Sequence, residues 1–288
     1  MADAGRVQKE NKSLGCGMKP ALIGAGLKAV VLAAGKGTRL QTGDGDAPKV
    51  MRLACGKPLL YHVLDALSFI DKNDIVIVVG YKREEVIGYF GSHIRGGASV
   101  SAPCYKFAEQ LEQLGTGHAV MAAQPELAGF DGAVLVCYGD MPAVRRDTYE
   151  ALILAHHEQG NDCTILTGES SDQMSYGRIV RDENGGFLHV VEAGDCTPEQ
   201  LGITELNSGV YVFRSRMLLD ALRELRNDNT QGEYYLTDVP AIMRANGAKV
   251  GICKRDLGDE IIGVNTLPQL AQVERILGAV CKPQEVSG

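Results

Sequence analysis

Glycines, an arginine and a lysine follow the first apolar run of the chain in an order that suits phosphate binding. Residues 28–32 are mostly apolar, and Gly35 and Gly37 come soon after them. Arg39 follows the glycines, and Lys49 comes ten residues later, directly after a proline. Glycine lets backbone N–H groups approach phosphate oxygens because it has no Cβ, while a guanidinium and an ammonium add positive charge. This stretch predicts a phosphate-binding loop at the carboxyl end of a buried strand, where open α/β sheets hold their ligands.

Two commoner glycine loops do not fit this stretch. A dinucleotide-binding fingerprint needs a third glycine three residues after the second, and Leu40 stands at that position. A Walker loop needs Gly-Lys-Ser/Thr after four intervening residues, and none follows Gly35. A plain glycine turn between a strand and a helix is the structural alternative. The arginine and the Pro48-Lys49 pair at this spacing argue against it.

Asp140 has the chemistry of a metal ligand. It follows an apolar run, residues 134–138, and one glycine, so we expect it at the carboxyl end of a buried strand. Mg²⁺ prefers oxygen ligands and is commonly held by one or two carboxylates together with substrate phosphates. Asn265, at the end of another short apolar run, offers an amide oxygen as a second ligand. The alternatives are a turn or N-cap aspartate and an ordinary cap asparagine.

Residues 110–118 predict a loop that enters a helix. The side-chain amide of Gln110 offers a donor and an acceptor, which match the imide edge of uracil, and the backbone of Gly115 and Thr116 could face the same base. In the structural alternative, Thr116 simply caps the helix. Chemistry alone leaves these two interpretations equal.

Alternating strands and helices must bring these residues to one edge of a sheet. The pattern predicts an α/β fold with a mostly parallel sheet covered by helices on both faces. From about residue 161 it predicts a smaller mixed β lobe, with a hairpin around an Asn-Gly turn at 184–185. Strands are expected at 28–32, 74–80, 100–106, 134–138, 164–167, 176–181, 187–192, 204–213, 249–253 and 261–266. Helices are expected at 59–67, 84–90, 145–159, 215–226, 236–246 and 267–280.

Composition narrows the class of protein. The 288 residues are 45% hydrophobic, which supports a substantial core, and the net charge of −7 argues against nucleic-acid binding. The eight cysteines contain no C-x-x-C pair, which is typical of reduced thiols in the cytoplasm and not of a disulfide framework or a zinc site. No apolar run approaches a membrane span and no signal peptide is recognisable, so we expect no membrane partner.

Taken together, the motifs resemble those of sugar-phosphate nucleotidyltransferases. L-A-A-G-x-G-T-R with a downstream P-K is similar to the signature of that family. Further motifs look like the uridylyltransferase domain of bacterial N-acetylglucosamine-1-phosphate uridylyltransferases, in the same order, at residues 112–119, 138–140, 176–180, 231–238 and 263–265. The resemblance covers about residues 28–277, which is nearly the whole chain.

This resemblance implies a Rossmann-like nucleotide-diphospho-sugar transferase fold and a Mg²⁺-dependent reaction. UTP and N-acetylglucosamine 1-phosphate would give UDP-N-acetylglucosamine, a cell-wall precursor, and pyrophosphate by in-line displacement. It also implies one domain over 28–281, with a nucleotide-binding half at 28–160 and a sugar-binding half at 161–281. A disordered leader is expected over 1–27 and a tail over 282–288. The resemblance is also compatible with a homo-oligomer.

The same resemblance implies the site residues. Arg39, Lys49 and Asp140 would be catalytic, and Asp140 and Asn265 would hold Mg²⁺. Gln110, Gly115 and Thr116 would contact the uridine, and Gly177, Glu192 and Asn207 the sugar. On the residues alone, Glu192 and Asn207 are equally credible as an exposed hairpin acid and a turn asparagine. The full set expected to contact substrates is Leu32, Ala33, Ala34, Gly35, Gly37, Thr38, Lys49, Gln110, Gly115, Thr116, Tyr138, Gly139, Asp140, Gly177, Glu192, Asn207 and Asn265.

Several departures keep alternatives open. The resembled enzymes usually carry a lysine where Gly194 stands and an arginine where Leu267 stands, so positive charge near the sugar is lost. Another sugar 1-phosphate such as glucose 1-phosphate, another nucleotide, and a non-catalytic nucleotide-sugar sensor are the alternative functions. No hexapeptide repeat is found, so no acetyltransferase activity is expected. The segment 231–238 is expected mostly to pack and cap helices.

Overall fold

The computed structural model describes residues 26–37, 40, 47–91, 104–169 and 176–281. Most of the expected leader, all of the tail, and the site candidates Thr38 and Arg39 therefore lie outside the described residues. The first strand begins at Leu27, one residue earlier than expected. Within the described chain, no helix is both long and apolar enough to cross a membrane.

Four parallel strands form the half of the sheet that carries the glycine loop. β1 (Leu27–Ala33) lies between β4 (Ile75–Val79) and β6 (Ala133–Tyr138), and β5 (Lys106–Glu109) extends the sheet beyond β4. All three pairings are parallel. The carboxyl ends of β1 and β6 therefore lie side by side, with Leu32 in register with Tyr138.

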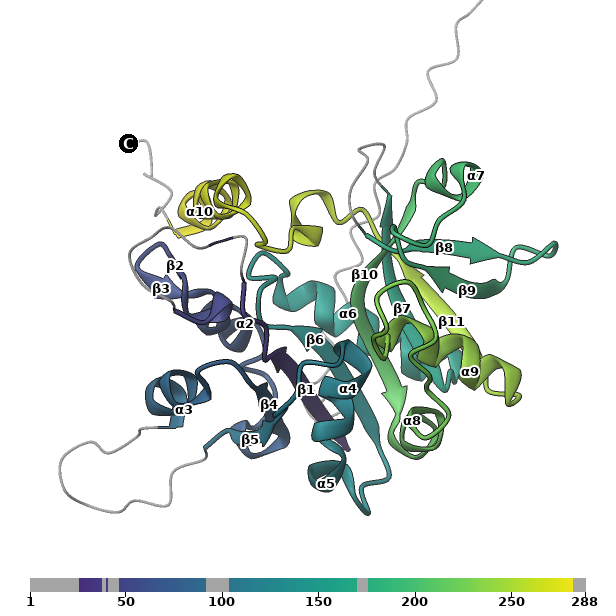
Figure 1. The fold of residues 1–288 in the computed structure, drawn as a ribbon, viewed down its shortest axis with the longest axis horizontal. Helices are drawn as coiled ribbons and strands as arrows, with labels where there is room; N and C mark the ends of the chain where they lie inside the picture. Colours follow the sequence, from purple (N-terminus) through teal and green to yellow (C-terminus); the bar gives the residue numbers. More distant parts are fainter. Residues whose placement is uncertain (1–25, 38–39, 41–46, 92–103, 170–175, 282–288) are drawn as a thin grey trace, which may run out of the picture.

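The second half continues the same sheet. β10 (Glu205–Arg214) pairs antiparallel with both β6 and β7 (Cys163–Glu169), and β11 (Val250–Lys254) runs parallel to β7. Along this main path, β10 alone among the described strands is reversed, which confirms the predicted mostly parallel sheet. The hairpin of β8 (Arg178–Arg181) and β9 (Phe187–Val191) attaches to β10 and forms the mixed lobe (Figure 1).

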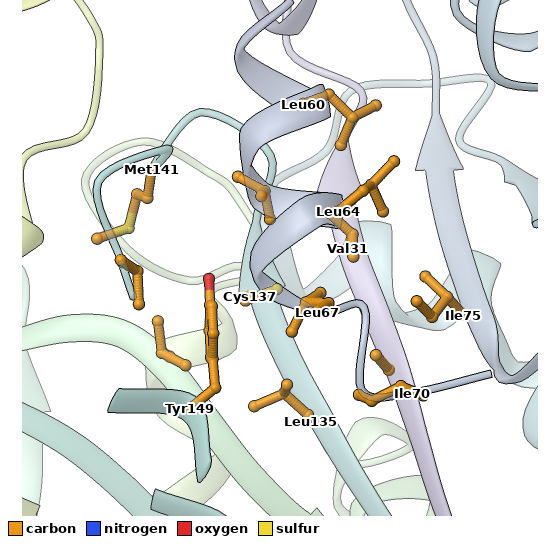
Figure 2. Close-up of a cluster of buried hydrophobic side chains, with 14 of the residues drawn as sticks. Val31, Leu60, Leu64, Leu67, Ile70, Ile75, Leu135, Cys137, Met141 and Tyr149 are labelled. Atoms are coloured by element: carbon orange, nitrogen blue, oxygen red, sulfur yellow. The ribbon is translucent and has the colours of Figure 1, made fainter. Parts of the chain in front are cut away.

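Helices cover both faces of the sheet, as predicted. One face packs against α2 (Leu59–Ala66), α3 (Arg83–Gly91) and α6 (Arg146–Gln159). The other packs against α4 (Thr116–Ala122), α5 (Gln124–Leu127), α8 (Ser215–Leu222) and α9 (Val239–Ala245). Because strand side chains alternate, Val31 enters the first core and Val30 the second. Figure 2 shows Leu60 and Leu64 of α2, and Leu67 directly after it, on the same side of the sheet as Val31.

A third, smaller core fixes the last helix. α10 (Leu267–Cys281) contacts β2 (Leu53–Ala54), which pairs with β3 (Lys57–Pro58), and Figure 1 shows α10 beside them. Val264 and Val273 belong to this core. The remaining short elements are η2 (Lys49–Met51), η3 (Lys72–Asp74), α7 (Pro198–Leu201), η4 (Leu236–Asp238) and η5 (Gly258–Ile261).

Three predicted elements are wrong in place or type. The third strand lies at 106–109 and not at 100–106, and residues 100–103 are outside the described chain. The helix predicted over 236–246 starts with the short η4. The strand predicted over 261–266 is absent from the described structure, because η5 ends there and the segment bonds to a tyrosine hydroxyl and a loop carbonyl instead of a sheet.

Candidate active site

Lys49, Asp140 and Asn265 meet at the carboxyl edge of the sheet. The Lys49 ammonium forms an ion pair with Asp140 and donates to Asn265 Oδ1 at 2.6 Å. Lys49 begins η2, Asp140 follows β6, and Asn265 precedes α10, so three distant segments supply one cluster. The Val264 N–H donates to the Asp140 carbonyl at 2.9 Å, which ties the Asn265 segment to the end of β6.

A cleft of about 390 Å³ contains this cluster and runs between the two halves of the chain. The predicted site residues that line it are Leu32, Ala34, Gly35, Lys49, Gln110, Gly115, Thr116, Tyr138, Asp140, Gly177, Glu192, Asn207 and Asn265. Ala33, Gly37 and Gly139 are described but do not line it. The Ala33 side chain is buried in the core of the first face, and Gly139 packs against Leu60 and Val50 beneath the cleft.

Gly37 brings the glycine loop against Lys49. Its φ of +67° is a conformation that favours glycine, and a Cβ there would lie 2.7 Å from Lys49 Cβ. The Ala34 carbonyl at the start of the loop accepts from the Tyr81 N–H at 3.2 Å and from Gln113 Nε2 at 2.9 Å. The loop thus lies against Lys49 on one side and is hydrogen-bonded on the other to the segments that follow β4 and β5.

Gln110 presents an acceptor to the cleft. It is buried, and its Nε2 donates to the Gly115 carbonyl at 3.0 Å and lies 3.1 Å from His118 Nδ1. A carbonyl only accepts, so the amide nitrogen must face Gly115. Its N–H groups are thus used inside the protein, so the donor expected to face a base is not available and only the Oε1 acceptor is left for a ligand.

Thr116 is not the helix cap of the structural alternative. Gly115, with a φ of +107°, is the N-cap residue of α4 and has no side chain to cap with. A Cβ at Gly115 would lie 2.6 Å from the Tyr234 carbonyl, so the close approach of that backbone requires glycine. The Thr116 hydroxyl instead accepts from the Leu236 N–H at 3.0 Å, which ties α4 to η4.

The far end of the cleft is acidic and well ordered by hydrogen bonds. Glu192 accepts from the Thr237 hydroxyl at 2.8 Å, and Asn207 Nδ2 donates to the Tyr211 hydroxyl at 2.6 Å. Burial raises the pKa of Glu192, and Asp195 adds to the rise. Burial also raises the pKa of Asp238 to about 6, with Glu192 contributing. Glu192 is therefore not an exposed acid, and Asn207 is a buried strand residue and not a turn asparagine.

Several lining residues were not predicted from the sequence. Glu233 and Thr237 belong to the segment 231–238 that was expected mostly to pack. Tyr176 and Gly263 line the cleft as well, and Gln113 lies beside the glycine loop. Their only signal was membership of the same motifs, because side-chain direction within a loop cannot be read from spacing. Within the described residues, no cluster of three or more His, Cys, Asp or Glu side chains is arranged for a metal ion.

Comparison with known proteins agrees with this geometry. The model of the MobA-like NTP transferase domain matches residues 29–241. Proteins named bifunctional protein GlmU are 45% identical over 248 residues in Lactobacillus delbrueckii subsp. bulgaricus and 43% identical over 249 residues in Clostridium novyi. These matches cover 86% of this chain but 51% and 52% of the relatives, so the chain spans about half the length of those relatives.

A solved structure shares the fold. A putative glucose-1-phosphate thymidylyltransferase from Bacillus anthracis, in complex with sucrose, superposes with a TM-score of 0.64 at 19% identity. The match covers 87% of this chain and 94% of that one. With the sheet, the glycine loop and the family match in agreement, the chain belongs to the family of MobA-like NTP transferase domains.

Proposed function

We propose that the protein transfers a uridylyl group from UTP to a sugar 1-phosphate, with N-acetylglucosamine 1-phosphate as the acceptor and pyrophosphate as the second product. The observation that carries this proposal is the meeting of Lys49, Asp140 and Asn265 at the end of the glycine loop. An ammonium, a carboxylate and an amide oxygen at one point suit a metal-bound triphosphate. The identity to the GlmU proteins supports the choice of substrates.

The two oxygen-bearing side chains fit a Mg²⁺ ion. Asp140 and Asn265 both contact the single ammonium nitrogen of Lys49, so their oxygens face one point. The protein would supply only these two ligands, and phosphate oxygens and water would complete the preferred six. Bound there, Mg²⁺ would draw the phosphate oxygens together and offset the charge that develops on them.

The chain's own residues would then position the two substrates and neutralise the charge of their phosphates. A sugar-phosphate oxygen attacks the α-phosphorus of UTP in line, the bond to the β-phosphate oxygen breaks, and pyrophosphate leaves. No covalent intermediate with the protein is needed. Lys49 would hold the phosphates that meet at the reacting centre, and the backbone of Gly35, which lines the cleft, would contact the triphosphate. Arg39, outside the described residues, would hold the β- and γ-phosphates.

The base end of the cleft favours uracil over cytosine. Gln110 offers its acceptor oxygen, which matches the N3–H donor of uracil or thymine. Cytosine carries an acceptor at that atom, so two lone pairs would face each other. At the opposite end, Glu192, Asn207 and the backbone of Gly177 would contact the sugar.

One assay tests the proposal. The full chain is incubated with UTP, N-acetylglucosamine 1-phosphate and Mg²⁺, and pyrophosphate and UDP-sugar are measured together. Equal amounts of both products are expected, and the Asp140→Asn variant should form both about 10²–10³ times more slowly. The same assay with four nucleotides and several sugar 1-phosphates identifies the preferred pair. Absence of pyrophosphate with every pair would overturn the proposal and favour a non-catalytic sensor.

A further inference from the structure

The hydroxyl of Tyr176 makes two hydrogen bonds to the segment that ends in Asn265. It donates to the Ile261 carbonyl at 2.7 Å and accepts from the Gly263 N–H at 2.9 Å. Tyr176 lies just before β8 and comes from a part of the chain 85 residues away from Ile261. One side chain thus uses both its donor and its acceptor on a stretch of backbone that has no strand partner among the described residues.

The contacts continue from Gly263 to the amide of Asn265. Asn265 Nδ2 donates to the Gly263 carbonyl at 3.2 Å, and this contact turns Oδ1 the other way, toward Lys49. The N–H of the same Gly263 is the group that Tyr176 holds. Tyr176 therefore acts on the residue whose carbonyl sets which atom of Asn265 faces the cleft.

Further anchors hold the segment, and none replaces Tyr176. At its start, Glu260 accepts from the Arg145 N–H at 3.0 Å and from the Thr148 hydroxyl at 2.6 Å. At its end, the Val264 N–H donates to the Asp140 carbonyl at 2.9 Å and the Asn265 N–H to Gln269 Oε1 at 2.8 Å. None of these bonds involves the Gly263 N–H, which belongs to the Ile262–Gly263 peptide. Loss of the Tyr176 hydroxyl leaves that N–H without its acceptor, so the Ile262–Gly263 peptide can rotate and, through the Gly263 Cα, shift the next peptide, which carries the carbonyl that Asn265 Nδ2 contacts.

Tyr176 is itself fixed. The Arg178 guanidinium donates to its backbone carbonyl, and the carbonyl of the adjacent Gly177 accepts from the Asn207 N–H at 2.9 Å. Burial raises the pKa of the Tyr176 hydroxyl, and the charge of Asp140 adds to the rise, so the group keeps its proton at neutral pH. Both the donor and the acceptor are thus available in the working range.

We infer that Tyr176 is a positioning residue that acts through Gly263 to hold Asn265 as a metal ligand. The inference rests on the proposed function, in which Asn265 and Asp140 share one divalent cation. Groups that orient a ligand usually change metal affinity by about 10- to 100-fold when they are removed. Because Tyr176 acts through backbone, we expect the lower end, about tenfold.

The test compares Mn²⁺ binding to the full chain without nucleotide, followed by the electron paramagnetic resonance signal of free Mn²⁺. Tyr176→Phe should weaken Mn²⁺ binding about tenfold and leave the melting temperature within a few degrees of wild type. Tyr149→Phe is the matched control, because Tyr149 lies in the core of the first face, as Figure 2 shows, and should leave the affinity unchanged.

A double variant separates positioning from a general effect. In an Asn265→Ala background, Tyr176→Phe should cause no further loss of Mn²⁺ affinity, since the residue it positions is gone. An equal loss in that background, or an unchanged affinity in Tyr176→Phe alone, would overturn the inference. Failure of the wild-type chain to release pyrophosphate would instead overturn the proposed function, and the Mn²⁺ comparison would still stand.

Discussion

Lys49 Nζ lies 2.6 Å from Asn265 Oδ1, although 216 residues separate the two. The same ammonium is paired with Asp140, so it contacts both proposed metal ligands at once. A lysine and a divalent cation repel each other, and they compete for the same two oxygens. Metal binding would therefore release Lys49 from Asp140 and Asn265, and the freed ammonium would be available to the phosphates.

Replacement of Lys49 by alanine should have opposite effects on turnover and on metal affinity. Loss of one stabilising charge at the reacting centre is expected to lower kcat by about 10²–10³, or 3–4 kcal/mol. Removal of the competing ammonium should strengthen Mn²⁺ binding to the nucleotide-free protein several-fold. Pyrophosphate release gives the first quantity and the signal of free Mn²⁺ the second.

Lys72→Ala is the control for that experiment. Lys72 lies in η3, before the amino end of β4 and thus at the edge of the sheet opposite the cleft. The Lys72→Ala substitution removes one positive charge without touching the site, so neither turnover nor Mn²⁺ affinity should change. An unchanged Mn²⁺ affinity in Lys49→Ala would show that the ammonium does not compete with the metal.

Asp140→Asn tests the carboxylate without changing its size. The backbone carbonyl of Asp140 still accepts from Val264, so the segment stays attached and the fold should be retained. Turnover is expected to fall by about 10²–10³, because the charge that would hold Mg²⁺ is lost. Circular dichroism checks the fold, and the Mg²⁺ dependence of pyrophosphate release checks the cause. Near wild-type turnover at low Mg²⁺ would contradict the assignment.

Lys49 and Asp140 could be predicted because simple rules place them. A glycine loop after one parallel strand and a carboxylate after its neighbour must meet at the same edge, and β1 and β6 are neighbours in register. Asn265 could be predicted only from metal chemistry and a resemblance. The strand predicted over 261–266 is wrong, because the backbone of this segment forms hydrogen bonds with the Tyr176 hydroxyl and the Asp140 carbonyl instead of with a neighbouring strand.

The sequence could not reveal the contacts that cross the cleft. Gly115 takes the N-cap position of α4 because it can adopt a positive φ, which moves Thr116 inward to bond with Leu236. Glu233 and Thr237 sit in a segment whose pattern indicates packing, yet both line the cleft, where hydrogen bonds such as that between Leu236 and Thr116 hold the segment beside α4. Such side-chain-to-backbone bonds between distant segments leave no periodicity to read.

The nucleotide preference should depend on Gln110. In the wild type, kcat/KM for UTP should be larger than that for CTP, and the ratio should correspond to about 1–3 kcal/mol, the cost of an unmatched buried acceptor. Gln110→Ala removes the acceptor and should narrow this ratio by lowering the value for UTP. Gln124→Ala, an equal truncation in α5 outside the cleft, should leave the ratio unchanged. A ratio unaffected by Gln110→Ala would place the base elsewhere.

The acidic end of the cleft should make stability depend on pH. Burial and the charge of Glu192 raise the pKa of Asp238 to about 6, above its ordinary value of 3.8. The folded state thus binds this proton more tightly than the unfolded state, so stability falls as pH rises from about 4 to about 6. Asp238→Asn removes the penalty and should stabilise the protein at pH 7.5 by about 1 kcal/mol, since solvent screens a half-exposed group.

Urea unfolding at pH 7.5 and at pH 4 measures this effect, and the gain should vanish at the lower pH. Asp131→Asn, at an exposed position before β6, should change stability little at either pH.

A second variant adds a positive charge to the acidic end of the cleft instead of removing a negative one. A Cβ at Gly194 would meet no atom within 4 Å, so Gly194→Lys fits without strain. Its ammonium would add positive charge next to Asp195 and should also stabilise the protein at pH 7.5, because opposite charge offsets the crowding of acids around Glu192. If neither variant stabilises the protein, these carboxylates do not interact as their positions indicate.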